Sequence, residues 1–154
     1  MVTVFSLVLA GCGMGLDEAI PILEADIVEM TEDFFTNQEY LLSHSAAMND
    51  YQGCYWPEVK VEVEIGGQLG RENGEVLLGE MRDYASARFG KTDEIYVDSW
   101  GGYFRADHQA GMIQVSITWD SVVRITGETG DCVDVGEVTF TSEVRHTPLA
   151  NSRP

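Results

Sequence analysis

The three cysteines carry the most distinctive chemistry in this sequence, because a thiol can be acylated or oxidised to a disulfide. Cys12 follows an uncharged, largely apolar N-terminal run and stands between two glycines. Cys54 and Cys132 are 78 positions apart, and each follows a polar, glycine-containing turn rather than an apolar run. These surroundings predict one role for Cys12 and a different role for the other two cysteines.

Cys12 belongs to the segment Leu9-Ala10-Gly11-Cys12-Gly13, which resembles the lipobox of bacterial lipoproteins. In that family a signal peptidase cuts before the cysteine, and the thiol receives a diacylglycerol. The resemblance implies a signal peptide over residues 1–11 and a lipid-anchored N-terminus over residues 12–15, on the outer face of the cell membrane. Because a secretory signal ordinarily begins with basic residues, which are absent here, we expect the true start to lie further upstream.

The same glycines allow two other interpretations. The run Gly11-Cys12-Gly13-Met14-Gly15 resembles the glycine-rich first motif of S-adenosylmethionine-dependent methyltransferases, in which glycines let the backbone approach the ligand. That family usually has an acidic residue where this chain has Leu9, and Leu16 replaces the third glycine of the dinucleotide motif. An ordinary buried strand and turn is the third interpretation. The lipobox is favoured over both.

Composition indicates a single domain with an acidic surface. We expect one α+β domain over residues 16–144 and a flexible tail over residues 145–154. The net charge of −17 repels phosphate backbones, which argues against nucleic-acid binding. It also repels anionic lipid headgroups, so the domain should stand away from the bilayer. The charge either keeps the protein soluble or captures a basic partner.

Cys54 and Cys132 are expected to form a disulfide. If Cys12 carries lipid, an even number of cysteines remains in an exported protein, which indicates a bridge. Closing so long a loop would stabilise the fold by roughly 2 to 4 kcal/mol. Two buried, reduced thiols are the alternative.

Hydrophobic periodicity predicts helices and strands in an order typical of an α+β fold. Apolar residues at three- and four-residue steps predict an amphipathic helix from residue 17 to about residue 47. A second helix is expected over residues 73–89. Strands are expected at 58–65, 94–99, 102–106, 111–119, 122–127 and 131–141. This order predicts an antiparallel sheet of about five to six strands with two helices on one face, whereas a methyltransferase would alternate strands and helices around a parallel sheet.

The stretch Val123–Cys132 adds a second family resemblance. Its Ile-Thr-Gly followed closely by Gly-Asp-Cys, together with the lipobox and the element order, looks like the mycobacterial lipoproteins called LppA and their actinobacterial relatives. The resemblance implies a lipid-anchored envelope protein with one internal disulfide. It brings no established catalytic residues.

Other side chains give weaker signals for chemistry. The histidines His44, His108 and His146 show no zinc-ligand spacing, and we expect them on the surface. Asp107-His108 lacks a nucleophile motif. We therefore expect no catalytic residue, metal or other cofactor. Aromatic residues could contact a ligand or partner, with core packing as the alternative; they are Tyr55, Trp56, Trp100 and Tyr103.

Together these observations predict a lipid-anchored, extracytoplasmic protein that is a non-enzymatic binding or interaction module. The expected partners are the membrane, through the N-terminal lipid, and a basic protein or an envelope glycan. One alternative is an acidic immunity or inhibitor protein that neutralises a basic partner. Another is a cytoplasmic S-adenosylmethionine-binding enzyme that uses the Gly11–Gly15 loop.

Overall fold

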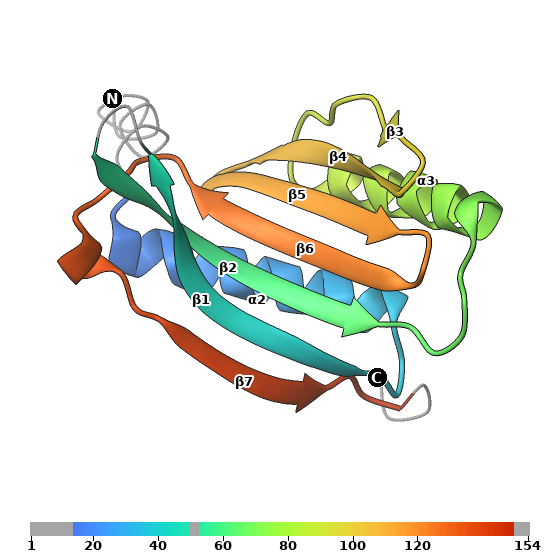
Figure 1. Ribbon diagram of the computed structural model, residues 1–154. Coiled ribbons are helices and arrows are strands. Elements are labelled where there is room, and N and C mark those ends of the chain that lie inside the picture. Colours follow the sequence, from blue (N-terminus) through green and yellow to red (C-terminus); the bar gives the residue numbers. More distant parts are fainter. Residues whose placement is uncertain (1–13, 50–52, 150–154) are drawn as a thin grey trace, which may run out of the picture.

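The computed structural model describes residues 14–49 and 53–149 (Figure 1). The two helices in this part of the chain are α2 (Leu16–Phe34) and α3 (Arg71–Arg88). The strands are β1 (Glu39–Asn49), β2 (Cys54–Glu64), β3 (Tyr96–Val97), β4 (Gly101–His108), β5 (Gly111–Thr118), β6 (Val122–Thr129) and β7 (Thr141–His146). A short 3-10 helix, η1 (Val135–Glu137), precedes β7.

All seven strands form one antiparallel sheet in the order β3-β4-β5-β6-β2-β1-β7. The N-terminal hairpin β1–β2 inserts between β6 and the C-terminal strand β7, so the first and last parts of the domain lie together. The α+β prediction is confirmed. The sheet has one or two more strands than expected, because β1 was predicted as helix.

Both helices lie on the same face of the sheet (Figure 1). Helix α2 packs on β2 and β6, and α3 packs on β4 and β5. Alternate strand residues point toward the helices and are fully buried, including Val61, Ile113, Val115 and Ile125. The residues between them face away from the helices. Two of these, Arg124 on β6 and Glu62 on β2, form a salt bridge in which Arg124 Nε lies 2.8 Å from Glu62 Oε2. One face is therefore core, and the other is charged and has neither of the two described helices packed on it.

The prediction that the first helix continues to about residue 47 is wrong. Helix α2 ends at Phe34, and Asn37 has a positive φ of 52° that breaks the helical path. Beyond it burial alternates: Tyr40 and Leu42 are buried, whereas Leu41 between them is 37% exposed. This period of two marks a strand, and pairing with β2 and β7 on both sides satisfies its backbone. Tertiary pairing thus overrides the helical spacing of Leu41.

The prediction of a strand over residues 131–141 is also wrong in most of its length. Val133 makes an isolated bridge with Tyr55, after which the chain turns through η1. Strand β7 begins at Thr141 and continues through residues 145 and 146, which fall within the predicted flexible tail. Thr147 is buried and its backbone N–H donates to the Gln38 carbonyl. The ordered sheet therefore extends into the predicted tail.

Candidate functional site: a pocket beside the first turns of α2

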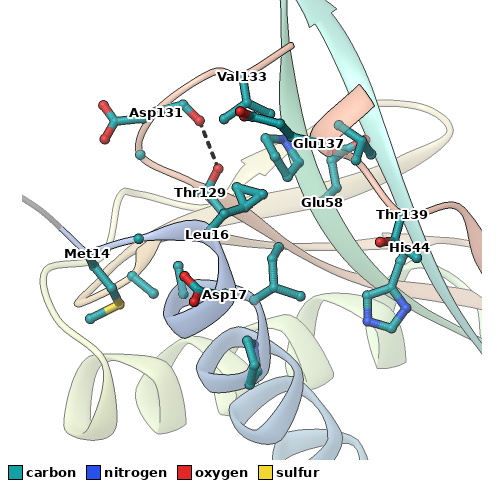
Figure 2. Close-up of a pocket in the computed structure, with 18 of the residues that line it drawn as sticks. Met14, Leu16, Asp17, His44, Glu58, Thr129, Asp131, Val133, Glu137 and Thr139 are labelled. Carbon is teal, nitrogen blue, oxygen red and sulfur yellow. Dashed lines mark hydrogen bonds between the residues drawn. The ribbon is translucent and has the colours of Figure 1, made fainter. Parts of the chain in front are cut away.

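A pocket of about 810 Å³ lies between the first turns of α2 and the segment that joins β6 to β7 (Figure 2). Its volume lies within the range of about 300 to 1,000 Å³ that is typical of small-ligand sites. Helix α2, the β1–β2 hairpin, the β4–β5 turn and the β6–β7 segment all contribute to the lining. The lining residues are Met14, Gly15, Leu16, Asp17, Ala19, Ile20, Pro21, His44, Ser45, Pro57, Glu58, Ala110, Thr129, Gly130, Asp131, Val133, Glu137, Val138 and Thr139.

Small side chains create part of this space. Ala19 on α2 is 2% exposed, and Ala110 in the β4–β5 turn is 5% exposed. Further along the same helix, Leu23 and Ile27 are large and reach β6. Because side chains three and four positions apart share one face of a helix, the first turns of α2 present alanine where the next turns present leucine and isoleucine. The helix therefore stands over a hollow at its N-terminal end.

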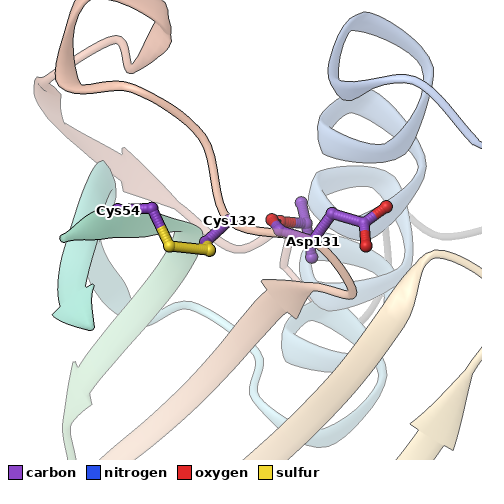
Figure 3. Close-up of a disulfide and its surroundings, with 4 residues drawn as sticks. Cys54, Asp131 and Cys132 are labelled. Carbon is purple, nitrogen blue, oxygen red and sulfur yellow. A yellow bond between two sulfur atoms is a disulfide. The ribbon is translucent and has the colours of Figure 1, made fainter. Parts of the chain in front are cut away.

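The opposite wall is held to β2 by a disulfide and by backbone hydrogen bonds. Cys54 and Cys132, which we predicted to pair, form a disulfide with their Cα atoms 5.5 Å apart (Figure 3). One residue further along each chain segment, Tyr55 and Val133 exchange two backbone N–H···O hydrogen bonds of 2.8 Å. Thr129 Oγ1 also donates to the Asp131 carbonyl at 3.0 Å. These links make the wall part of the folded domain.

The charged side chains around the pocket are almost all acidic. Asp17, Glu58, Asp131 and Glu137 line it, and no lysine or arginine is among the lining residues that the structure describes. In the described part of the chain, none of these four carboxylates forms a salt bridge. His44 could supply a positive charge, but its Nε2 lies 2.7 Å from Glu24 Oε1. The pocket is therefore a region of negative potential.

Glu58 also faces a like charge across the sheet. It lies directly opposite Glu128 in the β2–β6 register. Burial raises the pKa of Glu58, and the nearby Lys60 opposes that shift. Burial also raises the pKa of Glu128, and the negative charge of Glu58 raises it further. Both carboxyl groups are thus protonated more readily than an isolated glutamate.

No protein-family model, curated protein or solved structure matches this chain. The pocket and its chemistry are therefore the observations from which a function can be inferred.

The predicted aromatic contacts do not line the pocket. Tyr55 and Trp56 are consecutive on β2, so their side chains point to opposite faces of the sheet. Both are half-buried, whereas the β2 residues that border the pocket are Pro57 and Glu58. The aromatic residues in the sequence therefore indicated the correct end of β2, but they are not the residues that line the pocket.

The other two predicted aromatics lie elsewhere on the sheet. Trp100 is 82% exposed just before β4. The Tyr103 ring packs at a tilt against the Tyr96 ring, with ring centroids 5.2 Å apart. Strands β5 and β6 lie between β4 and β2, so β4 and β2 are about 14 Å apart across the sheet. The structure thus does not bring the four aromatics together into one site.

His108 is buried, so its predicted position on the surface is wrong. Its Nε2 lies 2.6 Å from Asp26 Oδ2, and its Nδ1 accepts a hydrogen bond from the Ala110 backbone N–H at 3.0 Å. Both ring nitrogens are therefore occupied, and the partner is Asp26 rather than the neighbouring Asp107. Within residues 14–49 and 53–149 there is no group of three histidine, cysteine or acidic side chains placed to hold a metal ion.

Cys12 and the expected signal peptide lie outside the described residues. Of the two helices that the structure does describe, neither is both long enough and apolar enough to cross a membrane.

The pocket itself was missed at the level of sequence because its lining comes from segments that are far apart in the chain. One signal did point there: a Cys54–Cys132 bridge must bring the β6–β7 segment against the start of β2.

Proposed function

We propose that this protein is a lipid-anchored envelope protein whose folded domain binds a small ligand in the pocket beside α2. The observation that carries the ligand-binding proposal is a pocket of about 810 Å³ between walls fixed by helix packing and a disulfide. A disulfide also suits an extracytoplasmic location, because such bonds persist in oxidising compartments. The anchor itself is inferred from the lipobox around Cys12.

Binding is favoured over catalysis by the side chains that line the pocket. A nucleophile needs an adjacent base to be activated. His44, the one histidine in the described lining, already has its Nε2 beside Glu24 and its Nδ1 2.7 Å from Thr141 Oγ1. It is therefore held as a link between α2, β1 and β7. The pocket offers a concave surface rather than an activated group.

The methyltransferase alternative has no support from the fold. That fold places its nucleotide at the end of parallel strands joined by helices, whereas every strand pair described here is antiparallel. Most of the glycine-rich run, residues 11–13, lies outside the described part of the chain. We therefore prefer the lipoprotein interpretation of these glycines.

Ligand binding can be tested with the neutral apolar dye N-phenyl-1-naphthylamine, whose fluorescence rises on transfer from water to an apolar site. Gly130 lines the pocket, and a Cβ added there meets no atom within 4 Å. Gly130→Trp should therefore fill the pocket without disturbing the fold. Gly66→Trp is a matched control, because Gly66 has equal space for a Cβ and lies at the other end of β2.

We expect saturable dye binding by the unmodified protein and by Gly66→Trp, and at least a tenfold loss of affinity in Gly130→Trp. Absence of saturable binding, or equal affinity in all three proteins, would contradict the proposal. Circular dichroism spectra establish that each variant is folded.

The anchor can be tested by mass spectrometry of the protein from its native membrane fraction. We expect the N-terminal residue to be Cys12 with acyl chains attached. We also expect Cys12→Ala to leave the membrane fraction. Recovery of an uncleaved, unacylated chain would refute the anchor without affecting the dye experiment.

A further inference from the structure

We propose that the ligand of this pocket is a cationic amphiphile, with an apolar body held inside and a positively charged head group at the acidic rim. This inference rests on the proposed function, since it assigns a chemical class to the ligand of the same pocket.

The apolar body is indicated by the side chains along the two long walls. Ile20 on α2 is half-buried although its neighbours in the core, Leu23 and Ile27, are completely buried. Val133 and Val138 on the opposite segment are half-buried as well. Such apolar surface is left in contact with water when the pocket is empty. Its removal from water would favour an apolar ligand.

The positive head group is indicated by the charges at the rim. Asp17 on α2 and Asp131 and Glu137 on the β6–β7 segment are all exposed. The N-terminus of a helix ordinarily favours an anion, but Asp17 and Glu18 already place negative charge in the first turn of α2. An anionic ligand would therefore meet repulsion, whereas a cation would meet several carboxylates that form no salt bridge within residues 14–49 and 53–149.

Elsewhere on the domain, five acidic side chains have arginine partners in the described structure. Arg88 pairs with Glu29 and Asp33 across the two helices, and other pairs join strands or lie along one element. Those further pairs are Arg71–Glu75, Arg124–Glu62 and Arg145–Glu143. The rim carboxylates Asp17, Asp131 and Glu137 form no salt bridge with a lysine or arginine of the described chain. A positive group on the ligand would complete the same pattern.

The charge preference can be measured by displacement of the neutral dye with three ligands that share a twelve-carbon chain. These are dodecyltrimethylammonium, dodecanoate and dodecyl maltoside, each used below its critical micelle concentration. We expect the cation to displace the dye at a concentration at least about tenfold lower than either of the others. Raising the salt concentration should reduce this advantage, since exposed charges are screened.

Two charge variants locate the preference. Asp131→Asn/Glu137→Gln should lower the affinity for the cation several-fold while the affinity for the neutral dye is retained. Glu80→Gln/Asp83→Asn changes the net charge equally on the exposed face of α3, and it should leave both affinities unchanged.

Equal displacement by the three ligands, or stronger displacement by dodecanoate, would overturn the cationic ligand class while dye binding still supported the pocket. An equal loss of cation affinity in both double variants would also overturn it, because net charge rather than the rim would then be responsible. Failure of the dye to bind would instead refute the proposed function itself.

Discussion

The middle of α2 and its N-terminal turns meet the sheet in opposite ways. In the middle, Leu23 and Ile27 are completely buried, and a Cβ added to Gly127 on β6 would lie 2.7 Å from Ile27 Cδ1. Helix and strand are thus in direct contact there. Two turns earlier, Ala19 and Ile20 face a hollow of about 810 Å³. The helix is fixed by its middle, which leaves its first turns available to line a binding site.

The two regions also differ in what holds them together. Close packing secures the middle of α2, as it does α3, where a Cβ on Gly74 would lie 2.6 Å from the Trp119 ring. The pocket wall opposite α2 depends on the Cys54–Cys132 disulfide instead. Stability should therefore respond most to changes in the packed region, and ligand binding should respond most to changes in the wall.

The largest effect is expected from Ile27→Ala, compared with the same substitution at Ile20 two turns away on the same helix. Ile27→Ala should lower the free energy of unfolding by about 4 kcal/mol, because it leaves a cavity in close-packed core. Ile20→Ala should cost about 1 kcal/mol or less, since this side chain borders space that already exists. Chemical denaturation measures both values. Equal losses would mean that the two ends of the helix are packed alike.

Removal of the disulfide should have the next largest effect. Cys54→Ala/Cys132→Ala releases a loop of 78 residues, which should lower the free energy of unfolding by about 3 kcal/mol. Because the same bond fixes the pocket wall, the affinity for the neutral dye should also fall several-fold. Reductant added to the unmodified protein should reproduce both changes. Unchanged dye affinity in a folded, reduced protein would show that the wall stands without the bond.

A smaller effect is expected where the C-terminal end of α2 meets α3. Tyr84 OH donates to Asp33 Oδ2 at 2.6 Å and accepts a hydrogen bond from Arg88 Nη1 at 2.9 Å. Tyr84→Phe should lower the free energy of unfolding by about 1 kcal/mol at neutral pH. Tyr103→Phe is the control, because no hydrogen bond of its hydroxyl is seen in the described structure.

The same contact predicts a dependence on high pH. Burial raises the pKa of Tyr84, and the hydrogen bond to Asp33 raises it further. The folded state thus holds this proton more tightly than the unfolded state. The contribution is complete below the unfolded value near 10 and is lost as the pH rises through the folded value. Burial also raises the pKa of Tyr40, so phenolate absorbance should show late-titrating tyrosines whose number falls by one in Tyr84→Phe and is unchanged in Tyr103→Phe.

The smallest effect concerns the acidic pair beside the pocket. Glu128→Gln removes a like charge directly opposite Glu58 and should stabilise the fold by about 0.5 kcal/mol at pH 7. Because the folded pKa of Glu128 is raised, its penalty is absent below the unfolded value near 4.5 and appears as the pH rises through the folded value. The gain should therefore vanish in acid. Glu64→Gln, opposite Val122, should give no gain, and a gain that persists at pH 3 would contradict the electrostatic cause.

Local patterns predicted the elements whose burial follows from the sequence alone. Alternation of apolar and charged residues predicted β2 at 58–65, and the structure places it at Cys54–Glu64. The predicted helix at 73–89 is α3 at Arg71–Arg88. Strand β1 could not be found in this way, because its backbone is satisfied by partners distant in the chain, up to His146. The helical spacing of Leu41 was coincidental.

The candidate site was predictable only through its covalent link. Cysteine counting placed Cys132 beside Cys54, and this pairing brings the β6–β7 segment against the β1–β2 hairpin. The pocket, however, depends on short side chains where two elements face each other, such as those of Ala19 and Ala110. From the sequence alone, an alanine in a helix indicates only a strong preference for helix. Its role in leaving space appears only when the facing segment is known.

The most direct test of the pocket is an NMR titration of the isotopically labelled domain with N-phenyl-1-naphthylamine. We predict saturable shifts in backbone amides of residues 16–21 and 129–139, with the middle of α2 and the uncovered face of the sheet unaffected. Shifts concentrated on that open face, or no saturable shifts at any residue, would contradict a ligand site beside the first turns of α2.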